Sequence, residues 1–410
     1  MSGGTTRPHR VLILVENAPV PGDRRVTEEA RSLHAAGYVV SVICPAAPER
    51  EIEEPLEGVT IKRYRPHTAT GGAVSQIAEY VVALAKTSWL MLRLLRSPGF
   101  DVIQACNPPD LFFLIVWPFK LLGKRFIFDQ HDLTPELFSV LYERDRGPVL
   151  RVLRWSERMT YALADTVIAC NESYRRIAVS RGHKRPGSVF VVRNGPREGW
   201  PLPVTADPGL KRGRRWLVVY MGVMGYQDGA DVLLSAVDVL VHEMGFHDAT
   251  FALVGDGNAA PSLRRQAAEL GIEEFVDFTG WISDEEILSR YLATADACVC
   301  PEPSSPLNDH STFIKVMQYM ASGTPIVAFD LPETRFSAGD AAAYAPSGDV
   351  RAFAERIREV LTDGPLRSTM EAAARERIPA LRWERQVPAL LAAYEHALAP
   401  QRRAGSRPTR

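Results

Sequence analysis

The chain has 410 residues, of which 46% are hydrophobic and 24% charged, and its formal net charge is -1. This length exceeds the roughly 250–300 residues at which single cores split, so we expect two domains. The balanced charge gives no overall attraction to nucleic acid, and we expect no nucleic-acid partner.

The start of the chain and its cysteines indicate a cytoplasmic protein. The first ten residues are polar and the following apolar run, VLILV, is too short for a signal peptide. No run reaches the roughly 18 apolar residues of a spanning helix. The five cysteines form no CxxC pair, which favours buried free thiols in a reducing compartment.

Short apolar runs alternate with helix-period segments through the first 200 residues. Such runs begin at Val11, Val39, Asp101, Arg125, Thr166 and Ser188. Their continuous apolar character is typical of strands buried on both faces of a parallel sheet. Residues 1–200 are therefore predicted to form a doubly wound, Rossmann-like α/β domain.

A Pro-, Gly- and charge-rich segment, 196–215, interrupts this pattern and reads as a linker. The alternation restarts at Trp216 and predicts a second Rossmann-like domain over 201–382. The helix expected at 383–400 has an apolar stripe, and we expect it to pack back on the first domain. The basic tail 401–410 is expected to be disordered. Two such sheets facing a cleft form the architecture called GT-B, which suits an enzyme with two substrates.

The stretch CPEPSSPLNDHSTFIKVMQYMASGTPIVAF predicts a strand, a polar loop, a helix and a second strand. Four N-cap types precede the apolar run, so free backbone amides at the helix start would suit a diphosphate. Lys315 would add a positive charge, and Gln318 could reach ribose hydroxyls. The alternative is an ordinary capped helix with a solvated lysine. The N-cap types are Asn308, Asp309, Ser311 and Thr312.

Two loops of the first half carry further candidates. In ENAPVPGDRR, Gly22 permits a close backbone approach, while Arg24 and Arg25 could bind an anionic group of donor or acceptor. The alternative is a solvated basic turn. In FDQHDLTPELF, polar residues crowd a strand's carboxyl end, where this fold places its chemistry. His131 is the candidate there, with Asp132 to orient its imidazole.

The stretch from Asn308 to Gly323 resembles the donor-site helix of the family-4 retaining glycosyltransferases, in which two glutamates are separated by seven residues. The text QYMASGTPIV matches the family phrase, with Gln318 at the second glutamate and His310 at the first. NDHSTFIK resembles a bacterial subgroup with this variant. Further matches are LVGDG (253–257), FTGWIS (278–283) and VVRNGP (191–196), so the resemblance covers nearly the whole chain.

The resemblance implies contact between His131 and the transferred sugar, with Lys315 beside the leaving diphosphate. Relatives clamp the diphosphate with an Arg and a Lys, but Val223 and Asp228 stand at those positions, so Lys315 and Arg193 are expected to supply the charge. The donor-binding residues implied are Arg193, Asn194, Gly222, Gly255, Gly257, Trp281, His310, Ser311, Thr312, Phe313 and Gln318.

The resemblance implies transfer of a sugar, with retention of configuration, from a nucleotide-diphosphate sugar, with a UDP-sugar favoured. The acceptor would belong to envelope polysaccharide, glycolipid or natural-product glycoside synthesis. No cofactor and no metal are expected, since no Asp-x-Asp motif occurs. The alternatives are a nucleotide-sugar epimerase and a non-catalytic sugar-nucleotide-binding protein.

The strongly apolar stretch from Ile77 carries only four charges, at Glu79, Lys86, Arg93 and Arg96. A helix of this kind either covers the sheet or lies on a bilayer surface. The second interpretation predicts a peripheral enzyme at the inner membrane face with a lipid-linked acceptor.

Overall fold

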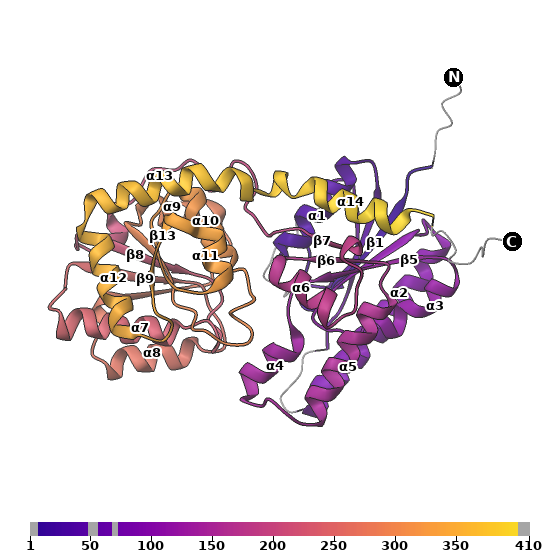
Figure 1. The fold of residues 1–410 in the computed structure, drawn as a ribbon, viewed down its shortest axis with the longest axis horizontal. Coiled ribbons are helices and arrows are strands. Elements are labelled where there is room, and N and C mark those ends of the chain that lie inside the picture. The colour runs from indigo at the N-terminus through magenta and orange to yellow at the C-terminus, as the bar shows by residue number, and fades with distance from the viewer. Residues whose placement is uncertain (1–6, 48–55, 68–72, 401–410) are drawn as a thin grey trace, which may run out of the picture. The chain divides into compact units, whose positions relative to one another are not determined.

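The computed structural model describes residues 7–47, 56–67 and 73–400, and the predicted tail 401–410 lies outside them. The chain divides into two compact units (Figure 1). The first consists of Met1–Pro135, Asp145–Val192 and Val387–Arg410, and the second of Glu136–Arg144 and Arg193–Gln386.

The first unit contains a seven-stranded parallel sheet in the order β3-β2-β1-β4-β5-β6-β7. Its inner strands are buried along their length, as the continuous apolar runs predict. The strands are β1 (Arg10–Leu14), β2 (Val39–Pro45), β3 (Val59–Tyr64), β4 (Val102–Cys106), β5 (Arg125–Gln130), β6 (Thr166–Ala169) and β7 (Val189–Val191).

Helices cover both faces of this sheet. The crossovers from β3 to β7 all run in one direction, so right-handed connections place α2, α3, α5 and α6 on one face and α1 on the other. The helices are α1 (Arg24–Ala35), α2 (Ala73–Arg96), α3 (Phe113–Leu121), α5 (Pro148–Leu163) and α6 (Glu172–Ser180), and α4 (Thr134–Tyr142) spans the division between the units. No helix among the described residues is long and apolar enough to cross a bilayer.

The last helix that the structure describes, α14 (Val387–Leu398), belongs to the first unit. It packs on β5, β6 and β7 and against α1, beside which Figure 1 draws it in yellow. Its buried side chains Leu390, Ala393, Tyr394 and Ala397 form the apolar stripe noted in the sequence. The predicted return of this helix to the first domain is confirmed.

The second unit contains a six-stranded parallel sheet in the order β10-β9-β8-β11-β12-β13, which confirms the prediction of two doubly wound domains. The strands are β8 (Trp216–Met221), β9 (Ala249–Val254), β10 (Val276–Gly280), β11 (Ala297–Cys300), β12 (Ile326–Phe329) and β13 (Ala342–Ala345). The helices are α7 (Ala230–Asp238), α8 (Ala260–Glu269), α9 (Glu285–Thr294), α10 (Ile314–Ser322), α11 (Pro332–Ala338), α12 (Val350–Thr362) and α13 (Gly364–Leu381).

Each sheet has one point at which the strand order reverses, between β1 and β4 and between β8 and β11. Loops that leave the carboxyl ends of such strands diverge and leave room for a ligand. The predicted site residues follow β1, β5, β7, β8, β9, β10 and β11, so the fold brings them to the carboxyl edges of the two sheets.

Gly195 lies where the second unit begins and the end of α13 returns to it. A Cβ at Gly195 would stand 1.8 Å from the Leu381 carbonyl oxygen, and the Trp383 amide donates to the Pro196 carbonyl beside it (3.1 Å). Only a residue without a side chain fits between these two backbones.

We expect Gly195→Ala to lower the free energy of unfolding by at least about 2 kcal/mol, because backbone must move to admit the methyl group. Gly364→Ala is the matched control, since nothing lies within 4 Å of its Cβ position. Chemical denaturation of both variants checks this, and equal stability of the two would contradict it.

Candidate functional site

A buried carboxylate organises the carboxyl end of β5. Asp129 Oδ1 accepts from Arg25 Nη2 at 2.9 Å, and Oδ2 accepts from Arg25 Nε at 3.3 Å. The imidazole Nε2 of His131 lies 2.7 Å from the same Oδ2. The carboxylate, fully buried, is thus held between a guanidinium and the histidine proposed from the sequence.

Arg25 is a structural cation and not an anion-binding residue of the first loop, so that prediction is wrong. Its guanidinium is buried and also pairs with Glu29 (3.1 Å) and donates to the Val192 carbonyl (2.8 Å). The physical reason is its place in the first turn of α1, which aims the side chain at the strand ends. Arg24 and Gly22 are exposed, and their acceptor-side roles stay predictions.

A second tier of buried groups supports Asp129. Gln104 of β4 donates from Nε2 to Glu29 Oε2 (2.6 Å) and to Asp129 Oδ2 (3.0 Å). The hydroxyl of Tyr394 on α14 donates to the Gln104 side-chain carbonyl. The sequence reasoning missed Glu29, Gln104 and Tyr394, although a glutamine inside an apolar strand indicates a buried polar partner.

Asn107 holds the backbone of the histidine loop. Its Oδ1 accepts from the amides of His131 (2.7 Å) and Asp132 (3.3 Å), while its Nδ2 donates to the Asp132 carbonyl (2.8 Å) and Thr134 Oγ1 (3.3 Å). The imidazole itself bonds to Asp129. The orienting role predicted for Asp132 therefore falls to Asp129, whose Oδ2 lies 2.7 Å from Nε2.

The charges of this cluster favour a protonated histidine. Burial by itself would lower the pKa of His131, but the adjacent Asp129 carboxylate raises that pKa to about 9. Burial works against ionisation of Asp129 too, yet Arg25 and His131 hold the pKa of this carboxyl below its usual range. Burial, together with the Asp129 charge, raises the pKa of Glu29 to about 8.

Cys106, Asp129 and His131 bring one candidate ligand atom each to within 4.8 Å of one another. Their chemistry does not suit a metal ion. Arg25 already neutralises the carboxylate, burial raises the pKa of the Cys106 thiol, and the histidine nitrogen that faces Asp129 is protonated.

In the second unit, α10 begins later than the sequence suggested. Phe313 is its N-cap and Ile314 its first residue, so Ser311 and Thr312 precede the helix, and the Ser311 amide donates to the Asn308 carbonyl (3.2 Å). Asn308 does not cap the helix, because its Nδ2 donates to the Gln227 and Pro303 carbonyls (3.0 and 2.9 Å) and ties two loops together. Ser311 and Thr312 are therefore not the first residues of the helix, contrary to the sequence prediction, whereas their contact with the donor stays a prediction.

Lys315 lies in a buried ion pair. Its Nζ is 2.5 Å from Oε1 of Glu302, which follows β11, and 4.0 Å from the ring centroid of Tyr220. Burial would lower the pKa of Lys315, but the Glu302 carboxylate raises it, so the ammonium stays charged. The lysine is thus not an uncompensated cation as expected. The sequence reasoning missed Glu302, whose place directly after an apolar strand was the available signal.

Glycines let the loops after β8 and β9 approach each other and Lys315. A Cβ at Gly222 would lie 3.1 Å from the Lys315 Nζ, and one at Gly255 would lie 1.9 Å from the Gly222 carbonyl oxygen. At Gly257 a Cβ would meet the Met224 carbonyl at 2.4 Å. The structure thus brings these three predicted glycines together around the end of β8.

The loop after β8 carries Val223 and Asp228 at the two positions where the resemblance predicts cations. Asp228 accepts a hydrogen bond from the Gly225 amide (2.9 Å) and so closes a turn, while Val223 is exposed.

Arg193 is also paired with an acid. Its Nη1 lies 3.6 Å from Glu333 Oε2, and its guanidinium carbon is 4.2 Å from the Phe336 ring centroid. Thr312 Oγ1 donates to the same Glu333 oxygen at 3.4 Å. Arg193 and Thr312 are therefore brought together, but the charge expected from Arg193 is compensated by Glu333.

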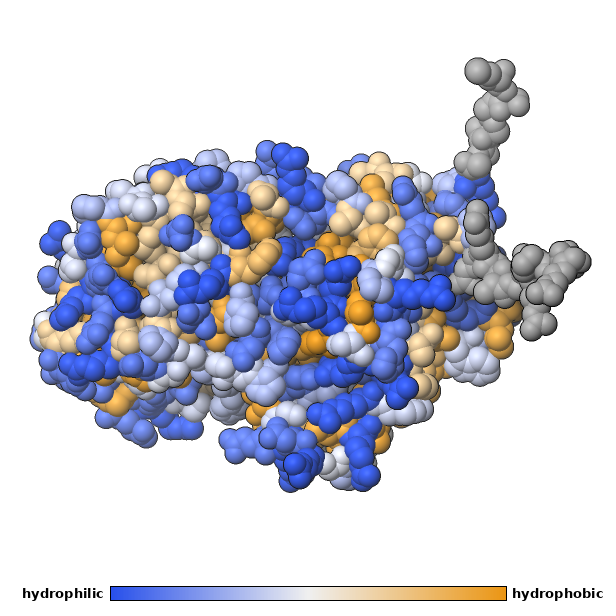
Figure 2. All heavy atoms as spheres, viewed as in Figure 1, coloured by the Kyte–Doolittle hydropathy of each residue, from blue (hydrophilic) through white to orange (hydrophobic). Residues whose placement is uncertain are grey.

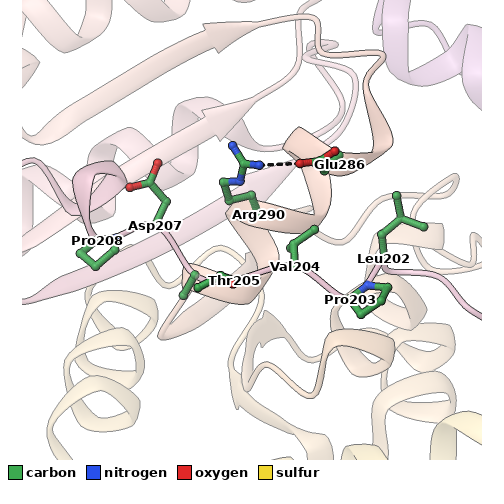
Figure 3. Close-up of a pocket in the computed structure, with 9 residues that line it drawn as sticks. Leu202, Pro203, Val204, Thr205, Asp207, Pro208, Glu286 and Arg290 are labelled. Atoms are coloured by element: carbon green, nitrogen blue, oxygen red, sulfur yellow. Dashed lines mark hydrogen bonds and ion pairs between the residues drawn. The ribbon is translucent and has the colours of Figure 1, made fainter.

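The remaining predicted residues lie in the same unit, and their roles in donor binding stay predictions. Trp281 is exposed, Asn194 and Gln318 are partly buried, His310 lies near the Pro306 carbonyl, and Phe313 packs on both apolar clusters of the unit. A pocket of about 740 Å³ in this unit is lined by 202–208 with Glu286 and Arg290 of α9 (Figure 3). None of the predicted donor residues lines it, so it does not mark the site.

Comparison with known proteins identifies the class. Residues 22–195 match the model of the glycosyl transferase 4-like domain, and residues 215–363 match that of the glycosyl transferases group 1. The chain belongs to this family of glycosyltransferases, as the motif resemblance predicted, and its enzyme class is a transferase.

Three relatives illustrate the likeness. The chain is 25% identical over 383 residues to a phosphatidyl-myo-inositol mannosyltransferase of Mycobacterium leprae, covering 92% of this chain and 93% of that protein. Sucrose-phosphate synthase of Thermosynechococcus elongatus superposes with a TM-score of 0.74 at 18% identity, over 94% of this chain and 98% of that one. HepE of Anabaena, solved with UDP and glucose, gives 0.68 at 16% identity over the same shares. The two structures confirm the fold.

We expect Lys315→Met to lower the free energy of unfolding by about 3–5 kcal/mol, because Glu302 is left as a buried unpaired charge. Adding Glu302→Gln should recover part of the loss. Arg335→Met is the control, since its pair with Asp330 is exposed and worth at most about 1 kcal/mol. Urea denaturation of the ligand-free variants measures this, and a loss no larger than that of the control would contradict it.

Proposed function

We propose that this glycosyltransferase moves a sugar from a nucleotide-diphosphate sugar, a UDP-sugar before a GDP-sugar, to a lipid-linked acceptor with retention of configuration. The observation that carries the donor side is the cluster of Gly222, Gly255, Glu302 and Lys315 at the reversal point between β8 and β11. Ligands of open parallel sheets bind at such points. HepE, a structural neighbour, was solved with UDP and glucose.

Lys315 is the proposed diphosphate ligand. An ammonium has three donors, of which Glu302 takes one, so the ion pair fixes Nζ in place while leaving donors for phosphate oxygens. Gly222 lets the β8 loop backbone approach the same nitrogen. A bound diphosphate would accept the hydrogen bonds that the Lys315 ammonium does not donate to Glu302.

The proposed reaction breaks the bond between the anomeric carbon and the diphosphate oxygen and forms one to the acceptor oxygen on the same face. The acceptor's proton passes to a phosphate oxygen of the leaving group. His131 would contact the transferred sugar, and fixed donors would stabilise the developing charge without a metal ion. A transferase needs an acceptor to turn over the nucleotide sugar, whereas an epimerase does not, so assays with and without acceptor distinguish the two activities.

A thermal-shift screen against UDP-, GDP-, dTDP- and ADP-sugars tests donor binding. A ligand at 100 times its Kd should stabilise the protein by about 2.7 kcal/mol. Lys315→Ala should abolish the shift measured against its own ligand-free state, whereas Arg335→Ala should keep it. If no sugar nucleotide shifts the wild type, the proposal fails.

The acceptor side rests on a surface of the first unit that we call the tryptophan face. It consists of the exposed side chains of α2, α3 and α5, which lie on the same side of the sheet. One tryptophan from each helix is about half exposed: Trp89 (55%), Trp117 (50%) and Trp155 (52%). Of the chain's other four tryptophans, only Trp281 is exposed.

Apolar and basic side chains surround these rings. Val81, Leu92, Leu114, Leu121, Val149 and Val152 are exposed on the same helices. Every exposed charged side chain that the structure describes on α2, α3 and α5 is an arginine, at positions 93, 96, 151, 154 and 158. Figure 2 shows such interleaving of orange apolar and blue hydrophilic residues on its visible face.

This combination favours an anionic bilayer over a protein copy. Half-exposed tryptophans suit the headgroup level, and arginines near an anionic membrane each add about 1 kcal/mol. A second copy of the same positive face would repel it. The mannosyltransferase relative is named for a phosphatidylinositol substrate, so a lipid acceptor at the inner membrane face fits this surface.

Vesicle co-sedimentation tests the tryptophan face. The protein should bind phosphatidylcholine vesicles only when they also contain phosphatidylglycerol, and binding should fall with salt. Arg151→Glu with Arg154→Glu should weaken it at least about tenfold. The control, Arg351→Glu with Arg356→Glu on α12, makes the same change of charge. Equal effects of the two pairs, or self-association through the face without vesicle binding, would refute the proposal.

A further inference from the structure

The two ring nitrogens of His131 have different surroundings. Nε2 bonds to the buried Asp129 carboxylate at 2.7 Å, and the side chain is 13% exposed. Among the residues that the structure describes, no hydrogen bond to Nδ1 is found. The ring therefore has one nitrogen committed to the protein interior and one available to a ligand.

We propose that Asp129, locked by Arg25, is a positioning residue that fixes the His131 ring and holds it as an imidazolium, whose Nδ1–H is offered to an anionic oxygen of the substrate. This role adds to the proposed sugar transfer. It rests on that function only for which substrate oxygen accepts the hydrogen bond from Nδ1.

The hydrogen bonds of the Asp129 carboxylate support this proposal, because four N–H groups donate to its two oxygens. Asp129 receives two N–H groups from Arg25, one from Gln104 and one from His131. A carboxylate with this many donors stays ionised and cannot rotate, so the histidine partner has one orientation and one favoured charge state. The Tyr394 hydroxyl on Gln104 extends the same rigidity to α14.

Several titratable or charged groups face this cluster from neighbouring elements. They are Asp23, Arg25 and Glu29 at the start of α1, Cys106 at the end of β4, Asp132 on the histidine loop, Cys170 after β6 and Tyr394 on α14. Burial raises the pKa of Cys106, Cys170 and Tyr394, so they stay neutral near pH 7.

Summed over Arg25, Glu29, Asp129 and His131 alone, the charges leave an excess of one positive charge, which the carboxylates of Asp23 and Asp132 face. Arg25 balances Asp129, and Glu29, with its pKa raised to about 8, is mostly protonated at pH 7. His131 carries the remaining charge. In the second unit Lys315 and Arg193 are likewise each paired with a carboxylate. A fixed imidazolium would therefore meet negative charge that develops in the transition state.

Histidine NMR on the full-length protein tests the inference without substrate. With ¹⁵N-labelled histidine, and His131→Gln to assign the signal, His131 should titrate near a pKa of about 9. A wild-type pKa at or below the ordinary value of about 6.5 overturns the inference by itself, even if no variant folds.

Two neighbouring carboxylates supply the variant and its control. Asp129→Asn should lower the proton affinity of His131 more than 100-fold, which appears as a lower pKa. Asp132→Asn should change the proton affinity far less. Retention of the high pKa in Asp129→Asn, or a larger drop in Asp132→Asn, contradicts the assignment.

The pH profile of kcat/KM gives the functional measurement. Its alkaline limb should move from about pH 9 in the wild type to below pH 7 in Asp129→Asn, a change that a merely structural role would not produce. An unmoved limb refutes the catalytic part. Failure of the donor screen would refute the proposed transfer yet leave the NMR result standing, so the two failures are distinguishable.

Discussion

The ion pair between Arg25 and Asp129 is the constraint on which the first unit's site depends. Two charges removed from water are tolerated only when each finds a partner and its remaining hydrogen-bonding groups are satisfied. Glu29, Gln104, the Val192 carbonyl and His131 meet those demands, and they come from α1, β4, the end of β7 and the β5 loop. Satisfying one buried charge therefore fixes the relative placement of four elements.

The second unit repeats this logic with different residues. Glu302 and Lys315 join the end of β11 to α10, and Gly222 leaves room for the lysine beside β8. Arg193 and Glu333 form a second, longer pair in the same unit. The chain thus has Lys315 and Arg193 near the strand ends. It carries His310 and Gln318 at the two positions where the resemblance predicts glutamates. In both units a carboxylate holds a cation in a fixed position, which makes the strand ends rigid.

Periodicity and turn chemistry predicted the layers of this fold, because continuous apolar runs and helix-period segments are local properties of the sequence. The return of the last helix followed from its apolar stripe. The partners of the buried charged side chains could not be predicted from the sequence in the same way. Arg25 looked like a surface arginine because its partners lie about 100 and 170 residues away, and the start of α10 moved because Asn308 bonds to a distant loop. Such long-range choices depend on burial, which one sequence does not reveal.

The position of α14 has a consequence for how the protein is made. This helix is synthesised after the whole second unit, yet its Tyr394 completes the hydrogen bonding of Gln104, deep in the first sheet. The first unit therefore stays unfinished throughout synthesis of the second unit, because its last element has not yet left the ribosome. A product that stops short of α14 would contain the complete second unit and every donor residue, but its histidine network would be open. The order of synthesis thus means that only chains long enough to include α14 can close the hydrogen-bond network of the histidine.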